Sequence, residues 1–150
     1  MNDVAELNLP PEVFAVSGEH TSTTLAEHVH ALAAVGEKAW ADHIDPRSAT
    51  VSVAQVEAAL RPVPRHLAQR RLARLLSGSL VSSYDLFGDE RARELAGRVV
   101  TQLGDSAEWW SNEDPELEGA RTRVTRCTVD GVVVARNATH FVVVLQLGED

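Results

Sequence analysis

Residues 121–147, RTRVTRCTVDGVVVARNATHFVVVLQL, are the part of the chain most strongly biased towards β structure. The runs 132–136 and 140–147 are rich in the β-branched and aromatic residues that favour strands. Asp130-Gly131 lies between two such runs, and this dipeptide is typical of a tight hairpin turn. The stretch therefore predicts a three-stranded antiparallel meander, with strands over 121–129, 132–136 and 140–147.

Amphipathic helices are predicted ahead of this meander. Thr24 and Glu27 have the spacing of a capping box, as do Ser52 and Gln55. Apolar residues then recur at helical spacing. Gly36 falls within the apolar stripe of the first helix, where it would allow another helix to cross closely. The predicted helices cover residues 24–44, 52–61, 64–77 and 89–103.

The predicted fold is α+β, with about four N-terminal helices followed by a C-terminal three-stranded antiparallel β-meander that packs one face on them. A chain of 150 residues has the length of one domain, and no segment has the composition of a linker. We therefore expect a single globular domain over 1–150. Its predicted parts are an irregular N-terminal arm (1–20, with a short edge strand near 13–16 as an alternative), a helical part (21–104), an acidic loop (105–120) and the meander (121–147).

Charge is sorted along the chain. The formal net charge is −8, yet residues 61–74 contain five arginines, one histidine and no acid, whereas residues 105–118 contain six acids and no base. A basic segment in an acidic chain indicates an anionic partner, either nucleic acid or an acidic protein surface. The alternative is that these arginines pair with the chain's own acidic loop, in surface ion pairs worth about 0–1 kcal/mol each.

The composition suggests a class of protein and a compartment. The acidic start, MNDVAELNLPPE, lacks the pattern of a secretion signal, and no apolar run approaches the ~20 residues of a membrane span. We therefore predict a cytoplasmic protein without a membrane partner. Thirteen arginines against one lysine, with abundant alanine, suggest a GC-rich coding sequence from a prokaryote or phage.

No motif indicates catalysis, a metal or a cofactor. Glu27 and His30 make a single Glu-x-x-His step, whereas di-iron bundles use that step on two helices. Cys127 lies in a predicted strand, where cysteine is usually a small buried hydrophobe. Trp109-Trp110 would either anchor a peptide or plug the core, and we favour the core. We expect no catalytic residue, no metal ligand and no cofactor.

Residues 51–81, VSVAQVEAALRPVPRHLAQRRLARLLSGSLV, resemble the helix-turn-helix core of winged-helix DNA-binding proteins. In that family a short helix opened by Ser or Thr, here Ser52, precedes a recognition helix. The second helix ends in a Leu-x-x-Leu pattern, here Leu72 and Leu75, before Gly78 and a small apolar pair. The resemblance implies that helix 64–77 contacts phosphates and base edges. The predicted contact residues are Arg65, His66, Gln69, Arg70, Arg71 and Arg74.

We therefore predict a non-catalytic binding module. The more specific hypothesis is a small winged-helix-like DNA-binding regulator that uses the arginine-rich helix 64–77. The alternative is a protein–protein interaction or assembly subunit, such as a small phage or complex structural protein, whose arginine-rich helix meets an acidic partner. Either hypothesis is compatible with an oligomer.

Overall fold

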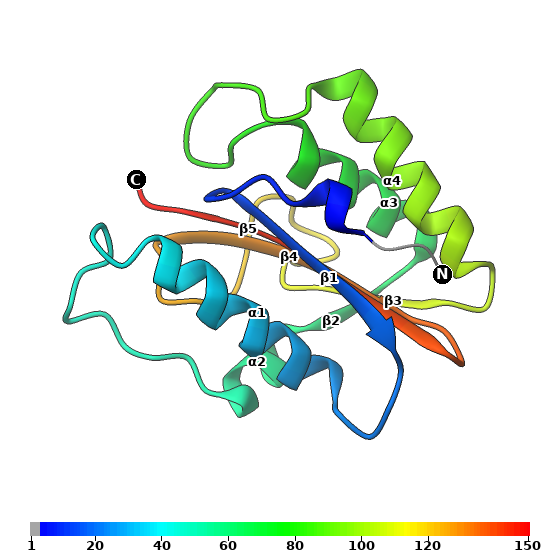
Figure 1. The fold of residues 1–150 in the computed structure, drawn as a ribbon, viewed down its shortest axis with the longest axis horizontal. Coiled ribbons are helices and arrows are strands. Elements are labelled where there is room, and N and C mark those ends of the chain that lie inside the picture. Colours follow the sequence, from blue (N-terminus) through cyan, green and yellow to red (C-terminus); the bar gives the residue numbers. More distant parts are fainter. Residues whose placement is uncertain (1–3) are drawn as a thin grey trace.

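The computed structural model describes residues 4–150, so residues 1–3 of the predicted N-terminal arm lie outside the described part (Figure 1). Its elements, in chain order, are η1 (Ala5–Leu7), β1 (Val13–Glu19), α1 (Leu25–Ala39), α2 (Val53–Ala59), β2 (Arg61–Val63), α3 (Arg65–Ser77), α4 (Asp89–Leu103), β3 (Glu108–Ser111), β4 (Val129–Arg136) and β5 (His140–Gly148).

An antiparallel sheet forms the centre of the molecule. Over residues 4–150 it has five strands in the order β1-β5-β4-β3-β2. β4 and β5 form a hairpin in which Val133 pairs with Val144, and residues 137–139 connect the two strands. β1 pairs with β5 at one edge of the sheet, and the short β2 pairs with β3 at the other.

The prediction of four N-terminal helices followed by a three-stranded meander is wrong. The described chain is α+β with four α-helices, but its sheet has five strands, and β1 and β2 lie before and between the helices. Residues 121–128 form a loop and not a strand, whereas Trp109 and Trp110 lie in β3 within the predicted acidic loop. The edge strand β1 contains the 13–16 stretch that the sequence offers as an alternative to an irregular arm. β2 and β3 were not predicted, because strands of three and four residues carry little periodic signal.

Helices cover both faces of the sheet (Figure 1). Val132 and Val134 of β4 belong to a core shared with α1 and α2, whereas Val133 and Ala135 belong to a core shared with α3 and α4. A sheet covered on both faces needs apolar residues at consecutive positions, since successive side chains point to opposite faces. The uninterrupted valine runs of β4 and β5 therefore reflect a three-layer arrangement, and not a meander with one face packed on helices.

The Asp130-Gly131 pair lies inside β4 and forms no turn. Its strand conformation is fixed by β5, because Asp130 pairs with Leu147 and Gly131 with Gln146. Crowding favours glycine at 131, since a Cβ atom there would lie 2.7 Å from Cδ2 of Leu75 and the leucine would have to shift. Tertiary packing thus overrides the local turn preference of the dipeptide.

The helices begin where their caps predict. The hydroxyl of Thr24 accepts the backbone N–H of Glu27 at 3.1 Å, and Ser52 and Gln55 form a reciprocal capping box. α1 ends at Ala39, five residues before the predicted end. Gly36 allows close approach of β5, and not of another helix: a Cβ atom there would lie 2.8 Å from Cδ2 of Leu147. Within residues 4–150, no helix is long and apolar enough to cross a membrane.

Gln146 fixes the end of α3 on the sheet. Its side-chain Nε2 donates to the carbonyls of Leu75, at 2.8 Å, and Gly78, at 3.0 Å. Its Oε1 accepts the backbone N–H of Leu80 at 2.7 Å. These bonds satisfy carbonyls that the end of a helix leaves unpaired, and they hold the arginine-rich helix in a defined position.

Candidate functional site

The arginine-rich helix α3 buries one face and exposes the other. Its buried apolar residues are Ala68, Leu72, Leu75 and Leu76. Arg65, His66, Arg70 and Arg74 are exposed, Gln69 is half-buried and Arg71 is buried. The stripe His66–Arg70–Arg74 therefore faces outward, whereas Arg71 points into the molecule.

The acidic segment 105–118 lies along α3 and supplies partners for its arginines. Arg65 pairs with Asp105, and Arg74 Nη1 lies 3.1 Å from Oε1 of Glu118. Arg61 of β2 pairs with Asp114 at 3.1 Å. All these side chains are at least one-third exposed, so each pair contributes little to stability.

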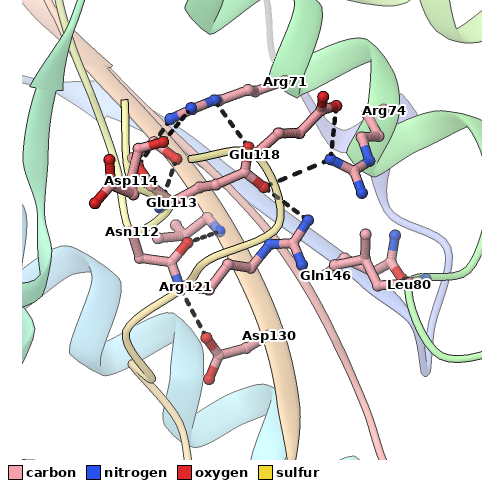
Figure 2. Close-up of polar contacts among 12 residues, drawn as sticks. Arg71, Arg74, Leu80, Asn112, Glu113, Asp114, Glu118, Arg121, Asp130 and Gln146 are labelled. Carbon is pink, nitrogen blue, oxygen red and sulfur yellow. Dashed lines mark hydrogen bonds and ion pairs between the residues drawn. The ribbon is translucent and has the colours of Figure 1, made fainter. Parts of the chain in front are cut away.

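Glu113 is the centre of a buried ionic cluster (Figure 2). Its Oε2 lies 3.0 Å from Nε of Arg71, and its Oε1 lies 2.8 Å from Nη2 of Arg121. Arg74 approaches the same Oε1 at 3.6 Å from the solvent side. Burial lowers the pKa of Arg121, and the neighbouring Glu113 carboxylate opposes this effect. The cluster joins α3, the end of β3 and the loop before β4.

Arg71 is bound to the 113–118 loop by an ion pair and two hydrogen bonds. Besides its ion pair, Nη1 donates to the carbonyl of Glu113 at 2.8 Å and Nη2 to the carbonyl of Asp114 at 2.5 Å. Only 8% of the side chain is exposed. Arg71 therefore holds the 113–118 loop on α3, and its burial keeps it from a partner at the surface.

Asp130 organises the loop below the cluster (Figure 2). Its carboxylate accepts the backbone N–H of Val124 at 3.1 Å, and both the N–H and the hydroxyl of Thr125 at 2.9 and 2.8 Å. Asn112 Nδ2 donates to the same carboxylate at 2.9 Å. Burial raises the pKa of Asp130, against the opposing effect of these hydrogen bonds. The loop 122–125 is thereby fixed beside Arg121.

A surface groove of about 310 Å³ lies between α3 and the 113–118 loop. We call it the α3 groove; it is lined by Leu67, Arg70, Arg71, Arg74, Glu113, Pro115, Glu116 and Glu118. Arg70 has no ion pair or hydrogen bond within residues 4–150. Leu117, in the same loop, is 63% exposed. The groove thus combines an unpaired cation, apolar surface and several carboxylates.

The two helices of the winged-helix resemblance lie on different sides of the sheet. Val56 and Ala59 of α2 belong to the α1/α2 core, whereas Leu72 and Leu75 of α3 belong to the opposite core. Strand β2 separates the two helices along the chain.

Other residues whose side chains could take part in catalysis or metal binding have structural roles. His30 hydrogen-bonds the carbonyl of Val51 at 3.1 Å, and Glu27 belongs to the cap of α1. Burial raises the pKa of the Cys127 thiol to about 12, so that it stays protonated at neutral pH. No group of three or more His, Cys, Asp or Glu side chains that could hold a metal ion occurs in residues 4–150.

Sequence reasoning missed Glu113, Arg121 and Asp130. Glu113 is one of six acids in a segment without periodic pattern, and Arg121 lies in the predicted strand 121–129. Their contacts form because residues 113–128 fold back onto α3 and β4. No local pattern in the sequence indicates such a long-range contact. Comparison with known proteins gave no matching family model, no matching curated protein and no matching solved structure.

Proposed function

We propose that this chain is a non-catalytic binding module that uses the α3 groove to bind an acidic segment of a partner protein. The observation that carries the proposal is the position of Arg70. It is exposed and unpaired within the described chain, at a groove whose other cations are already engaged. A carboxylate from a partner would supply the missing counter-charge, and arginine binds carboxylates well in interfaces.

Arg74 provides a second contact that a partner can take over. Its side chain is 44% exposed and its partner Glu118 is 73% exposed. Because such a pair contributes at most about 1 kcal/mol, a partner carboxylate can replace Glu118 at small cost. Leu117 and Pro115 offer apolar surface beside these cations.

The surroundings of the groove favour a protein partner over DNA. Glu116 and Glu118 line it, and Asp105 and Asp114 flank α3. A nucleic-acid backbone presents a continuous row of phosphates, which these four acids would repel. A protein segment with one or two carboxylates can avoid them. Binding to DNA through α3 stays a prediction, and the same experiment tests it.

Fluorescence anisotropy with designed probes tests the proposal. The probes are a labelled peptide with alternating Glu and Leu, the same peptide with Gln for Glu, and a labelled DNA duplex. We expect the chain to bind the Glu peptide, and binding to weaken with salt and in Arg70→Gln. Arg93→Gln is the matched control, because Arg93 is an exposed arginine of α4 without an ion pair in the described structure.

Each other result has a definite meaning. Binding of the duplex that depends on Arg70 while the peptide fails to bind would support the DNA-binding hypothesis. Equal binding of the Glu and Gln peptides would contradict recognition of carboxylates. Absence of binding to all three probes at low salt would remove the α3 groove as a contact surface.

A further inference from the structure

A second pocket, of about 420 Å³, lies on the α1/α2 side of the sheet. We call it the Trp110 pocket. Its size falls within the range of about 300–1,000 Å³ that is common for small-molecule sites. The lining comes from the loop between β1 and α1, the start of α1, α2 and the residue that follows it, and β3 and β4. The lining residues are His20, Thr21, Ser22, Thr23, Thr24, Leu25, Ala26, Glu57, Leu60, Trp110 and Arg136.

Trp110 and Arg136 come from paired strands. Trp110 pairs with Val134, and Arg136 lies two residues further along β4, so that both side chains emerge on the same face of the sheet. The guanidinium Cζ of Arg136 lies 5.2 Å from the centroid of the Trp110 ring. This cation–π contact orients the guanidinium without using its hydrogen-bond donors.

Arg136 keeps donors available for a ligand. Its one ion pair in the described chain is with Glu108, at 3.6 Å, which is longer than a hydrogen bond. The side chain is 37% exposed and forms no hydrogen bond within residues 4–150. A carboxylate could therefore bind Arg136 through short charge-assisted hydrogen bonds.

The pocket also has polar groups without partners in the described structure. The ring Nδ1 of His20 is buried and has no hydrogen bond. The hydroxyls of Ser22 and Thr23 and the carboxylate of Glu57 also bind no other group of residues 4–150. A buried nitrogen without a partner is uncommon in proteins and calls for a water or ligand atom.

Apolar groups complete the pocket. Leu25, Ala26 and Leu60 line it together with the indole of Trp110. A pocket that combines these four apolar residues with polar and charged ones suits a small organic molecule better than an inorganic ion, because an ion would leave the apolar groups without a contact.

We propose that the Trp110 pocket binds a small organic monocarboxylate with an apolar body. The carboxylate pairs with Arg136, and the apolar body lies against Trp110, Leu25 and Leu60. Glu57 adds a selective feature, because its negative charge opposes a second anionic group on the ligand and thereby disfavours dicarboxylates and phosphate esters. The proposal is independent of the α3 groove.

Nuclear magnetic resonance of the tryptophan indole N–H groups tests this proposal. Phenylacetate is the probe, and phenylacetamide is its neutral analogue. We expect millimolar phenylacetate to shift the Trp110 signal saturably, and phenylacetamide to bind about tenfold more weakly or worse. Two other tryptophans serve as internal references, and their signals should not shift. They are Trp40, whose Nε1 donates to the carbonyl of Pro11, and the buried Trp109.

Variants then test whether Arg136 binds the carboxylate of the ligand. Arg136→Gln should weaken phenylacetate binding about tenfold or more, and Arg98→Gln should leave it unchanged. Arg98 is a matched control because it is 40% exposed, close to the 37% of Arg136, but lies on α4. Glu57→Gln should improve the binding of succinate relative to phenylacetate.

Three outcomes would overturn the proposal. They are equal binding of phenylacetate and phenylacetamide, equal loss of affinity in the two arginine variants, and no shift of the Trp110 signal with any acid at millimolar concentration. Unchanged Trp109 signals in each variant would show that the fold is intact, so that a loss of binding is not a loss of structure.

Discussion

Arg71 and Glu113 form a buried ion pair, in which Nε of the arginine lies 3.0 Å from Oε2 of the glutamate. The two side chains are only 8% and 5% exposed. Burying two charges is costly, and the cost is offset only while both partners and their added hydrogen bonds are present. The pair therefore attaches the 113–118 loop firmly to α3, and it determines which arginines of that helix stay free.

We expect Glu113→Gln to destabilise the protein by about 3–5 kcal/mol, because it leaves the buried Arg71 and the half-buried Arg121 without their shared counter-charge. Urea unfolding followed by circular dichroism measures the change. Glu118→Gln is the control, since it removes only the exposed partner of Arg74 and should cost less than about 1 kcal/mol. If both variants lost a similar free energy of unfolding, the buried cluster would contribute no more to stability than the exposed Arg74–Glu118 pair.

Asp130→Ala should cost at least about 3 kcal/mol, because it leaves the donors of Asn112, Val124 and Thr125 buried without an acceptor. Asp42→Ala is the control: Asp42 is exposed and has no partner in the described chain, so its loss should change stability by less than about 0.5 kcal/mol. The same urea titration compares them. A small effect at Asp130 would mean that water replaces its carboxylate.

Replacing the mid-helix glycines Gly36 and Gly97 by alanine should change the stability of the protein in opposite directions. Both variants gain about 0.5–1 kcal/mol of helix propensity. At Gly97 the new methyl lies 3.6 Å from Nε2 of Gln69, an ordinary contact, so Gly97→Ala should be stabilising. At Gly36 it lies 2.8 Å from Cδ2 of the buried Leu147, and the clash should make Gly36→Ala destabilising by about 1–3 kcal/mol. Thermal unfolding measures both, and a stabilising Gly36→Ala would refute the close α1–β5 contact.

Cys127 should resist alkylation by iodoacetamide at pH 8 in the native protein and react readily in denaturant. It is fully buried, and burial raises its pKa from 9.0 to about 12, whereas the thiolate is the reactive form. Native labelling as fast as that of a free thiol would contradict this environment.

The same thiol predicts a pH dependence of stability. Between pH 9.0 and about 12 the unfolded chain loses the Cys127 proton while the folded chain keeps it. Stability should therefore fall as pH rises through this window. Cys127→Ala lacks the titrating group, so the wild-type free energy of unfolding should fall more steeply with pH than that of the variant. Parallel pH profiles would contradict the prediction.

The helices were predicted well because their signals are local. The Ser52–Gln55 capping box and the apolar spacing of residues 89–103 reside within one element, and the structure confirms both. The ends of α3 and α4 were also correct, at Ser77 and Leu103. The sheet was predicted poorly because the partners of a strand are distant in sequence. Val63 of β2 pairs with Trp109 of β3, and nothing within either segment indicates the other.

Like the fold, the candidate site has features that are local in the sequence and features that depend on long-range contacts. The sequence alone determined that α3 carries an arginine-rich face and that an acidic segment exists to meet it, since charge and helical spacing are properties of the residues themselves. Only the tertiary structure decided that Arg71 is buried on Glu113 while Arg70 stays exposed and unpaired within residues 4–150. The two residues are adjacent and chemically identical. Their difference arises because the 113–118 loop packs against one side of the helix, and that contact joins segments some forty residues apart.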